Sequence, residues 1–473
     1  MANQHHHNHG QNGQKDTQVV VVMVPLPAQG HLNQLLHLSR LITAYNIPVH
    51  YVTPTTHGRQ VKLRVQGWDP LATTNIHFHE FPIPSFVCPP PDPNASSPYP
   101  SQILPSFRAS LTLREPVGSL LRSLSATTER VIVIHDSLMA SVVQDVPSIA
   151  NAESYCFLST SAFSTSLFSW EATREPVSIE PEILKESPSF ESCFVPELLE
   201  FAVAQDNYRE FNSGSLHNSC RVIENHYLDI LAKKEIKGSV KQWVIGPFNP
   251  VEIPKNENSN GPQHPCLDWL DKQPPKSVIF VSFGTTTSLT DEQTKELAIG
   301  LEKSEQNFIW VLRDADKGDM SAGEVKRSEL PEGFEERVKG RGKVLTDWAP
   351  QLEILGHPST GGFLSHCGWN SCLESISMGV PMATWPMHSD QPSNALLITK
   401  VLKVGLAVKD WARRHEIVNS LMVENAVKRL MVSAEGEEMR KRAGELGGAV
   451  RKSVEEGGLS RLDMDSFIAH ITR

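Results

Sequence analysis

The chain has 473 residues, with 44 basic and 54 acidic side chains and therefore a net charge of −10. This acidic balance, without any long block of Lys and Arg, excludes a general binder of nucleic acid or of anionic membranes. The length alone allows about three domains, or two large α/β domains. Seven cysteines without a CxxC pair disfavour a disulfide framework and suit a reducing compartment.

The first segment, residues 1–17, is polar and contains His5, His6, His7 and His9. It has no apolar core of the kind that a secretory signal requires, so we expect a disordered tail, with a metal-binding tail as the alternative. The first apolar run, residues 19–24, is far too short to span a membrane. These features predict a cytoplasmic protein without a membrane span.

Short apolar runs at 19–24, 49–52 and 131–134 alternate with helical patterns such as that of residues 32–42. Runs that are apolar on both faces predict a parallel sheet covered by helices on each side. Two stretches rich in proline, 88–100 and 175–196, interrupt this alternation. We interpret them as long loops that shape a site rather than as domain boundaries.

The clearest boundary is the stretch 247–262, which is rich in Pro, Asn and Gly and has no periodicity. Strand patterns then resume at 278–283, 308–312 and 362–364. Thr290 and Gln293 predict a capping box for the helix that follows. The chain is therefore predicted to form two doubly wound α/β domains, residues 18–246 and 263–455, that face each other across one cleft. Such sheets bind ligands outside the carboxyl ends of their strands.

The segment 348–391 carries most of the candidate chemistry, because its centre reads as a strand, a tight turn and a helix at 369–378. A helix N-terminus preceded by Gly368 suits a diphosphate, since its free N–H groups and its dipole favour negative charge. His366, Asn370 and Ser371 add donors. The alternative is an ordinary strand–helix junction capped by Asn or Ser.

Four other side chains of this segment fit the remaining parts of a nucleotide sugar. Trp348 offers a face on which a nucleobase can stack. Glu374 lies four residues after Asn370, on the same helix face, and can accept both hydroxyls of a ribose. Asp390 and Gln391 suit sugar hydroxyls. The alternatives are a core position for Trp348 and a solvated helix position for Glu374.

The segment resembles the 44-residue signature of plant UDP-dependent glycosyltransferases, without a gap. The shared positions are Trp-Ala-Pro-Gln at 348–351, His-Cys-Gly-Trp-Asn-Ser at 366–371, Glu374, Gly-Val-Pro at 379–381 and Asp-Gln at 390–391. The resemblance implies a GT-B fold of two Rossmann-like domains, a UDP-sugar bound by the second domain, and inversion at the anomeric carbon. It also implies the donor-binding residues, which are Gly284, Thr285, Trp348, Ala349, Gln351, His366, Trp369, Asn370, Ser371, Glu374, Asp390 and Gln391. At 387–389 the chain has Met-His-Ser where many members have Gln-Trp-Thr.

The catalytic candidates lie in the first half. His31 follows the first strand, and an imidazole is suited to take the proton of an attacking hydroxyl because its ordinary pKa lies near neutrality. Pro-Ala-Gln-Gly-His at 27–31 resembles the catalytic loop of the same family, which implies that His31 is the general base. Asp136, after the strand at 131–134, can orient it, although His135 and Asp145 lie nearby in sequence.

Beyond about residue 17 the chain is similar to the zeatin O-glycosyltransferase branch of that family. The stretches that carry this likeness are 30–40, 136–141, 282–287 and 467–471. The branch implies transfer of glucose or xylose, from UDP-glucose or UDP-xylose, to the side-chain hydroxyl of the cytokinin zeatin. A flavonoid or another phenolic acceptor, a UDP-sugar epimerase and a non-catalytic nucleotide-sugar binder are the alternatives.

The remaining expectations concern the acceptor, the C-terminus and the partners. Apolar acceptor-binding residues are expected in the first domain, namely Phe86, Phe107, Phe163 and Phe168. The C-terminal helix at 456–473, with an apolar face of Leu462, Phe467, Ile468 and Ile471, is expected to pack back on that domain. We expect no metal or other cofactor, no nucleic acid, and a monomer.

Overall fold

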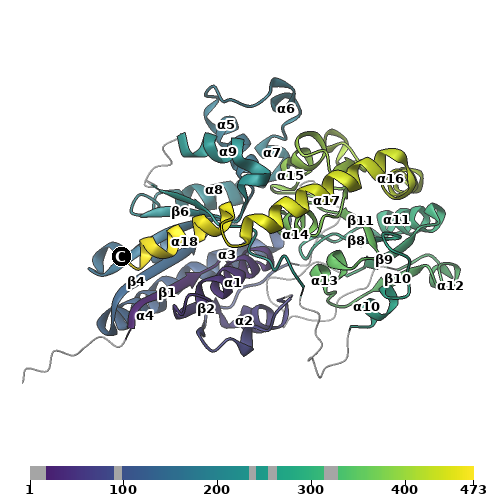
Figure 1. Cartoon of the computed structure of the whole chain (residues 1–473). Coiled ribbons are helices and arrows are strands. Elements are labelled where there is room, and N and C mark those ends of the chain that lie inside the picture. Colours follow the sequence, from purple (N-terminus) through teal and green to yellow (C-terminus); the bar gives the residue numbers. More distant parts are fainter. Residues whose placement is uncertain (1–16, 66, 90–98, 234–240, 254–263, 314–328) are drawn as a thin grey trace, which may run out of the picture.

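The computed structural model describes residues 17–65, 67–89, 99–233, 241–253, 264–313 and 329–473. Within them the chain forms two all-parallel sheets with helices packed against them, one in each half of the sequence (Figure 1). The first sheet has the order β3-β2-β1-β4-β5-β6-β7 and the second the order β10-β9-β8-β11-β12-β13. These are the two Rossmann-like units of a GT-B fold, as the sequence predicted.

The strands of the first sheet are β1 (Thr17–Val24), β2 (Val49–Pro54), β3 (Ile76–Phe81), β4 (Thr128–Asp136), β5 (Ala152–Leu158), β6 (Gly214–His217) and β7 (Gln242–Val244). Those of the second are β8 (Val278–Ser282), β9 (Asn307–Val311), β10 (Gly342–Leu345), β11 (Thr360–Ser365), β12 (Met382–Thr384) and β13 (Gly405–Ala407).

The helices of the first half are α1 (Gln29–Thr43), α2 (Thr55–Leu63), α3 (Leu104–Ser110), α4 (Arg114–Thr127), α5 (Ala162–Thr173), α6 (Pro181–Glu186), α7 (Phe190–Cys193), α8 (Pro196–Asp206) and α9 (Arg221–Lys233). Those of the second half are α10 (Pro265–Leu270), α11 (Asp291–Ser304), α12 (Phe334–Arg337), α13 (Gln351–Gly356), α14 (Trp369–Met378), α15 (Gln391–Leu396), α16 (Ser420–Val432), α17 (Ala434–Val454) and α18 (Leu459–Ile471).

The unbroken apolar run of β1 follows from burial of both faces of the first sheet. Val21 and Met23 belong to one core cluster, together with residues of α1 and α18. Val22 and Val24 belong to another, together with residues of α3 and α4. A strand without a solvated face has no position for polar side chains, so the sequence does not alternate.

The start of α11 differs from the predicted capping box in one respect. The Thr290 hydroxyl accepts a hydrogen bond from the Gln293 backbone N–H at 3.0 Å, as expected of a cap. The Gln293 side chain, however, bonds both backbone groups of Val418, at 2.8 and 3.0 Å, instead of returning to Thr290. The second hydrogen bond of a capping box, from the Thr290 backbone N–H to the Gln293 side chain, is therefore absent, because the Gln293 amide is hydrogen-bonded to the distant, buried backbone of Val418.

The last two helices connect the two halves (Figure 1). α17 packs against α14 of the second half, and α18, yellow in Figure 1, crosses to the edge of the first sheet at β7. Phe467 and Ile471 are fully buried in the first core. Leu462, expected on the same apolar face, is 52 % exposed, and Met464 takes the inward position one helical turn before Phe467.

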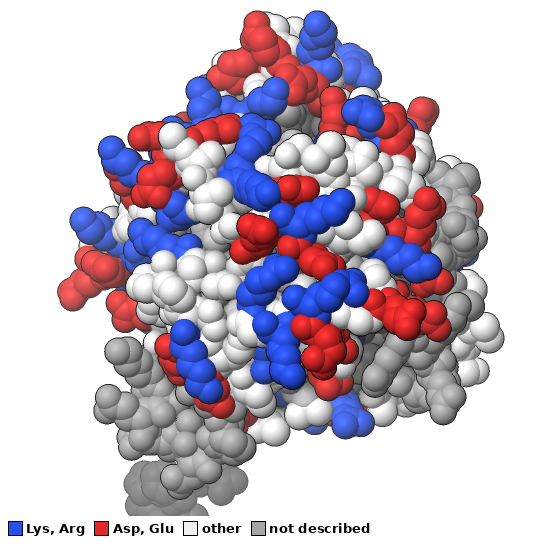
Figure 2. Space-filling model, turned by 90° about the vertical axis from the view of Figure 1, so that its right-hand side faces the viewer, with Lys and Arg blue, Asp and Glu red and all other residues white. Residues whose placement is uncertain are grey.

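Two expectations lie partly outside the described residues. Of the tail predicted for 1–17, only Thr17 is described, and it opens β1. Of the linker predicted for 247–262, residues 254–262 are not described. Among the helices that are described, none combines the length and the apolar character needed to cross a bilayer. Acidic and basic side chains are interspersed over the face of the second half that Figure 2 shows.

Candidate active site

A cleft of about 450 Å³ lies between the two halves at the carboxyl ends of their strands. Its lining residues follow strands of both sheets, for example Ala28 after β1, Ser137 after β4, Gly284 after β8 and His366 after β11. This is the edge at which open parallel sheets bind ligands. His31 and every predicted donor-binding residue line this cleft.

His31 lines the cleft and contacts Asp136, which lies fully buried behind it, although 105 positions separate the two residues in the chain. His31 lies in the first turn of α1, and Asp136 is the last residue of β4. The His31 Nδ1 atom and the Asp136 Oδ2 atom are 2.6 Å apart. The other carboxylate oxygen of Asp136 accepts the backbone N–H of Leu138 at 2.9 Å, so this fully buried carboxylate is held from two sides.

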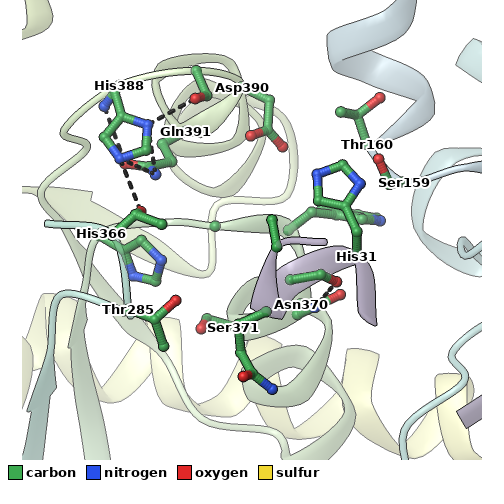
Figure 3. Close-up of a pocket in the computed structure, with 18 of the residues that line it drawn as sticks. His31, Ser159, Thr160, Thr285, His366, Asn370, Ser371, His388, Asp390 and Gln391 are labelled. Atoms are coloured by element: carbon green, nitrogen blue, oxygen red, sulfur yellow. Dashed lines mark hydrogen bonds between the residues drawn. The ribbon is translucent and has the colours of Figure 1, made fainter. Parts of the chain in front are cut away.

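The arrangement fixes the chemistry of the imidazole. A carboxylate only accepts hydrogen bonds, so the proton on the neutral ring sits on Nδ1, and Nε2 keeps its lone pair. Burial lowers the pKa of His31, but the carboxylates of Asp136 and Asp390 outweigh it, and the net pKa is raised. The imidazolium form of His31 is thus stabilised, as a proton-accepting role would require. Figure 3 shows His31 and Asp390 on opposite sides of one open space.

At the turn between β11 and α14, the backbone of two glycine residues lies close to the imidazole ring of His366. A Cβ atom at Gly284 would lie 2.5 Å from the His366 Nε2 atom, and one at Gly368 would lie 2.6 Å from it. Only glycine therefore allows both loops to approach this ring. Cys367, between His366 and Gly368, has a left-handed backbone with φ of 66°. A non-glycine residue adopts this conformation at a cost in free energy, and such residues cluster at functional sites.

The N-terminus of α14 is open, with no side-chain cap on its N–H groups. The Asn370 amide donates to the Gly30 carbonyl at 2.8 Å instead, and the Ser371 hydroxyl accepts from Gln351 at 2.9 Å. This excludes the alternative of an ordinary junction capped by Asn or Ser. An uncapped helix start facing a cleft suits an anion. Burial lowers the pKa of His366 to about 4, so its ring is a neutral partner.

The ribose and base candidates lie together at one end of the cleft. The Gln351 amide donates to the Glu374 carboxylate at 2.7 Å, and burial raises the pKa of Glu374 to about 7. Glu374 is thus no solvated helix residue. The Trp348 ring has the guanidinium groups of Arg64 and Arg313 at 5.1 and 5.7 Å from its centroid. Trp348 is partly exposed and lines the cleft, so it is not a core residue, and planar guanidinium groups already lie over its ring.

The candidates for the sugar have other partners as well. The Asp390 carboxylate accepts from Asn394 at 2.8 Å, and the Trp369 indole N–H donates to the Asn218 carbonyl at 2.8 Å. The Gln391 side chain accepts the backbone N–H groups of Met387 and His388. Gln391 therefore holds the unusual Met-His-Ser turn in place, and its carbonyl oxygen is already engaged. Figure 3 shows His388 beside Gln391 at this end of the cleft.

The opposite wall of the cleft is apolar and comes from the first half. It consists of Tyr99, Pro100, Ile103, Phe107, Leu138, Phe168, Phe190, Phe194, Leu198, Leu199 and Ala202. Phe107 and Phe168 were expected here. Phe163 was also expected, but it lies in the core, where its buried ring packs edge-on against Tyr227 at 4.7 Å. Phe86 is half-buried and does not line the cleft either.

Tyr99, Phe190 and Phe194 are lining residues that the sequence did not single out. Phe190 and Phe194 form a cluster with Phe168, at centroid distances of 5.2 and 5.3 Å from its ring, and Tyr99 adjoins Phe194 at 6.3 Å. All three occur in the two proline-rich stretches that were interpreted as site-shaping loops. The signal in the sequence that could have identified Phe190 and Phe194 is the proline-rich stretch 175–196, in which these two aromatic residues lie four positions apart.

Comparison with known families agrees with the division into two halves. Residues 17–250 match the family described as glycosyltransferase, N-terminal domain. Residues 247–439 match the family described as UDP-glucoronosyl and UDP-glucosyl transferase.

Individual proteins resemble the chain over nearly its whole length. It is 58 % identical to the zeatin O-glucosyltransferase of Phaseolus lunatus over 459 residues, which cover 97 % of this chain and 98 % of that protein. It is 55 % identical to the zeatin O-xylosyltransferase of Phaseolus vulgaris over 462 residues, or 97 % of this chain and 99 % of the relative. The structure of Phytolacca americana UGT2 complexed with UDP-2fluoro-glucose and pterostilbene superposes with a TM-score of 0.73. That structure is 26 % identical and covers 97 % of this chain and 100 % of its own.

Proposed function

Because the chain belongs to the UDP-glucoronosyl and UDP-glucosyl transferase family and transfers sugar from a UDP-sugar to a small acceptor, we propose that the acceptor is the side-chain hydroxyl of zeatin and that the sugar is glucose or xylose. Two relatives more than half identical to it are named for these reactions. The observation that carries the proposal is the His31–Asp136 pair, which lies between an open helix start and an apolar wall.

The proposed reaction is a direct displacement. The acceptor hydroxyl gives its proton to the His31 Nε2 atom while its oxygen attacks the anomeric carbon. The bond between that carbon and the β-phosphate oxygen of UDP breaks as the new bond forms. Attack from the side opposite to the leaving group inverts the configuration, so an α-linked donor yields a β-glycoside. Asp136 stabilises the imidazolium that results.

The donor is held by the second half in this proposal. The N–H groups at the start of α14 and the His366 ring bind the diphosphate, Trp348 stacks on the uracil, and Glu374 accepts the ribose hydroxyls. The loops that contain Gly284, Thr285 and Ala349 approach the donor. Gln351 orients Glu374. Asn370 and Ser371 lie beside the diphosphate. Trp369, Asp390 and Gln391 border the sugar. We propose that no metal or other cofactor is needed, which full activity in EDTA tests.

In this proposal the acceptor is bound by the first domain, residues 18–246. The donor is bound by the second domain, residues 263–455. In this proposal the planar purine packs against the aromatic rings that line the cleft, among them those of Phe107 and Phe168. Six of the seven cysteines are free, buried thiols, which supports a reducing, cytoplasmic location for the enzyme, and we propose that it acts as a monomer.

The proposal is tested with an acceptor panel. The protein is incubated with UDP-glucose or UDP-xylose and with trans-zeatin, cis-zeatin, several flavonoids, and isopentenyladenine, which lacks the side-chain hydroxyl. Mass spectrometry is expected to show a glycoside of zeatin and none of isopentenyladenine. A preference for flavonoids would replace zeatin by a phenolic acceptor.

An epimerase of the same fold is the other candidate, and the apolar wall argues against it, because isomerising a sugar needs no second apolar pocket. Incubation with UDP-glucose alone separates the two reactions. We expect the donor to remain UDP-glucose, whereas sugar isomerisation without an acceptor would indicate an epimerase.

A further inference from the structure

The proline-rich segment 174–195, which joins α5 to α8, belongs to the first half by sequence but is bonded to the second half. We propose that Trp411, at the start of the short helix η7 (Trp411–Arg413), is a positioning residue that holds the aromatic acceptor wall in place through this segment. This rests on the proposed function, because it assigns a residue to the acceptor side of that cleft. In Figure 1, α7 lies next to α15 of the second half, and α6 lies farther out.

Among the described residues, three polar contacts fasten the segment to the second half. The Trp411 indole N–H donates to the Ser192 hydroxyl at 3.0 Å. The Ser389 backbone N–H donates to the Cys193 carbonyl at 2.9 Å. At the outer end, Lys400 forms an exposed ion pair with Glu186 at 2.8 Å, which contributes little because water screens it. The two inner hydrogen bonds are therefore the effective anchors, and both attach to α7.

The residues on either side of these anchors carry the acceptor wall. Phe190 and Phe194 flank Ser192 and Cys193, and both line the cleft. Their rings pack on each other and on Phe168, with centroids 5.2 to 6.2 Å apart. A shift of α7 therefore moves two rings of the wall together.

α7 depends on such anchors because it is a helix of only four residues. So short a helix is not stable by itself in water, since few hydrogen bonds repay the ordering of its backbone. The first half supplies the cap of Ser189 and a bond from the Phe190 N–H to Glu171 at 2.9 Å. Ser192 also donates to the Ser189 carbonyl at 2.7 Å, so the hydroxyl that Trp411 holds belongs to this cap.

The same anchors connect the acceptor wall to the sugar side. Ser389 directly precedes Asp390, which borders the proposed sugar site. The acceptor wall thus takes its position from the domain that binds the donor.

The test replaces the hydrogen-bond donor but keeps an aromatic ring, as in Trp411→Phe. We expect the KM for trans-zeatin to rise about 2- to 12-fold, the effect of one hydrogen bond, with kcat and the KM for UDP-glucose unchanged. Hydrogen exchange of the peptide that contains residues 189–195 should become faster. Because Ser192→Ala removes the same bond, adding Trp411→Phe to it should raise the KM no further.

Ser466→Ala is the matched control, because its hydroxyl also accepts an indole N–H across the two halves, from Trp243 at 3.4 Å, far from α7. This variant should change neither the acceptor KM nor the exchange at 189–195. An acceptor KM and an exchange rate in Trp411→Phe equal to those of the wild type would overturn the proposal, as would equal increases in both KM values. If the wild type does not act on zeatin, the proposed acceptor is wrong, and the exchange at 189–195 alone decides the role of Trp411.

Discussion

The two sides of the cleft are built in different ways. The proposed donor side comes almost entirely from one segment of the second half, residues 348–391, in which a strand, a turn and a helix place residues close in sequence along the cleft. The acceptor side is assembled from loops and short helices spread between residues 99 and 202. A contiguous site is fixed by local geometry, whereas a dispersed one depends on packing between distant segments. His31 lies where the two sides meet, so variants can separate what each side contributes.

The largest effect is expected at the junction. His31→Ala removes the proposed proton acceptor, and we expect kcat to fall by about 10²- to 10⁴-fold. Calorimetric titration with UDP should give an unchanged affinity, because the donor side is intact. If turnover stayed at the wild-type level, His31 would have no part in the reaction.

On the donor side, Trp348→Ala removes the proposed stacking platform of the uracil. Stacking contributes about 1–3 kcal/mol, so the Kd for UDP should rise about 5- to 150-fold. The KM for the acceptor should stay the same, because the apolar wall is not touched. Equal UDP affinity in the variant and the wild type would show that the base lies elsewhere.

The pH dependence distinguishes the two sides again. The pKa of His31 is raised above its ordinary value, so the ring becomes charged as the pH falls through that pKa, and kcat should fall with it. The pKa of Glu374 is about 7, so below that pH it loses the charge that is proposed to bind the ribose hydroxyls. We expect the donor KM to rise about 3- to 10-fold in acid, the difference between charged and neutral hydrogen bonds.

Glu374→Gln is the control for that rise. It should flatten the pH dependence of the donor KM and leave the pH dependence of kcat in place. A donor KM that rises equally in both proteins would assign the titration to another group.

The smallest effect is expected on the acceptor side. Phe194→Leu removes one ring of the aromatic cluster, and we expect the acceptor KM to rise about 2- to 10-fold while the donor KM stays unchanged. Phe163→Leu is the matched control, because it removes an aromatic ring from the core instead of from the cleft. It should lower the free energy of unfolding by about 0.5–3 kcal/mol without changing the acceptor KM. The reverse pattern would place Phe163 at the acceptor.

The difference between contiguous and dispersed sites also explains what could be predicted from the sequence. The alternation of apolar runs and helical patterns was enough for two parallel sheets, and α14 spans Trp369–Met378, the range predicted. Phe163 and Phe194 are equally apolar in sequence, and only the packing of α5 on α9 turns the first one inward. Gln293 failed to complete its capping box because Val418, 125 positions away, binds its amide.

The proposed direct displacement of UDP by the acceptor hydroxyl is tested most directly by the configuration of the product at its anomeric carbon. The protein is incubated with UDP-α-glucose and trans-zeatin, and the glycoside and released UDP are followed by nuclear magnetic resonance. The mechanism predicts a single β-linked glucoside on the side-chain oxygen, formed in step with UDP. An α-linked product would contradict it.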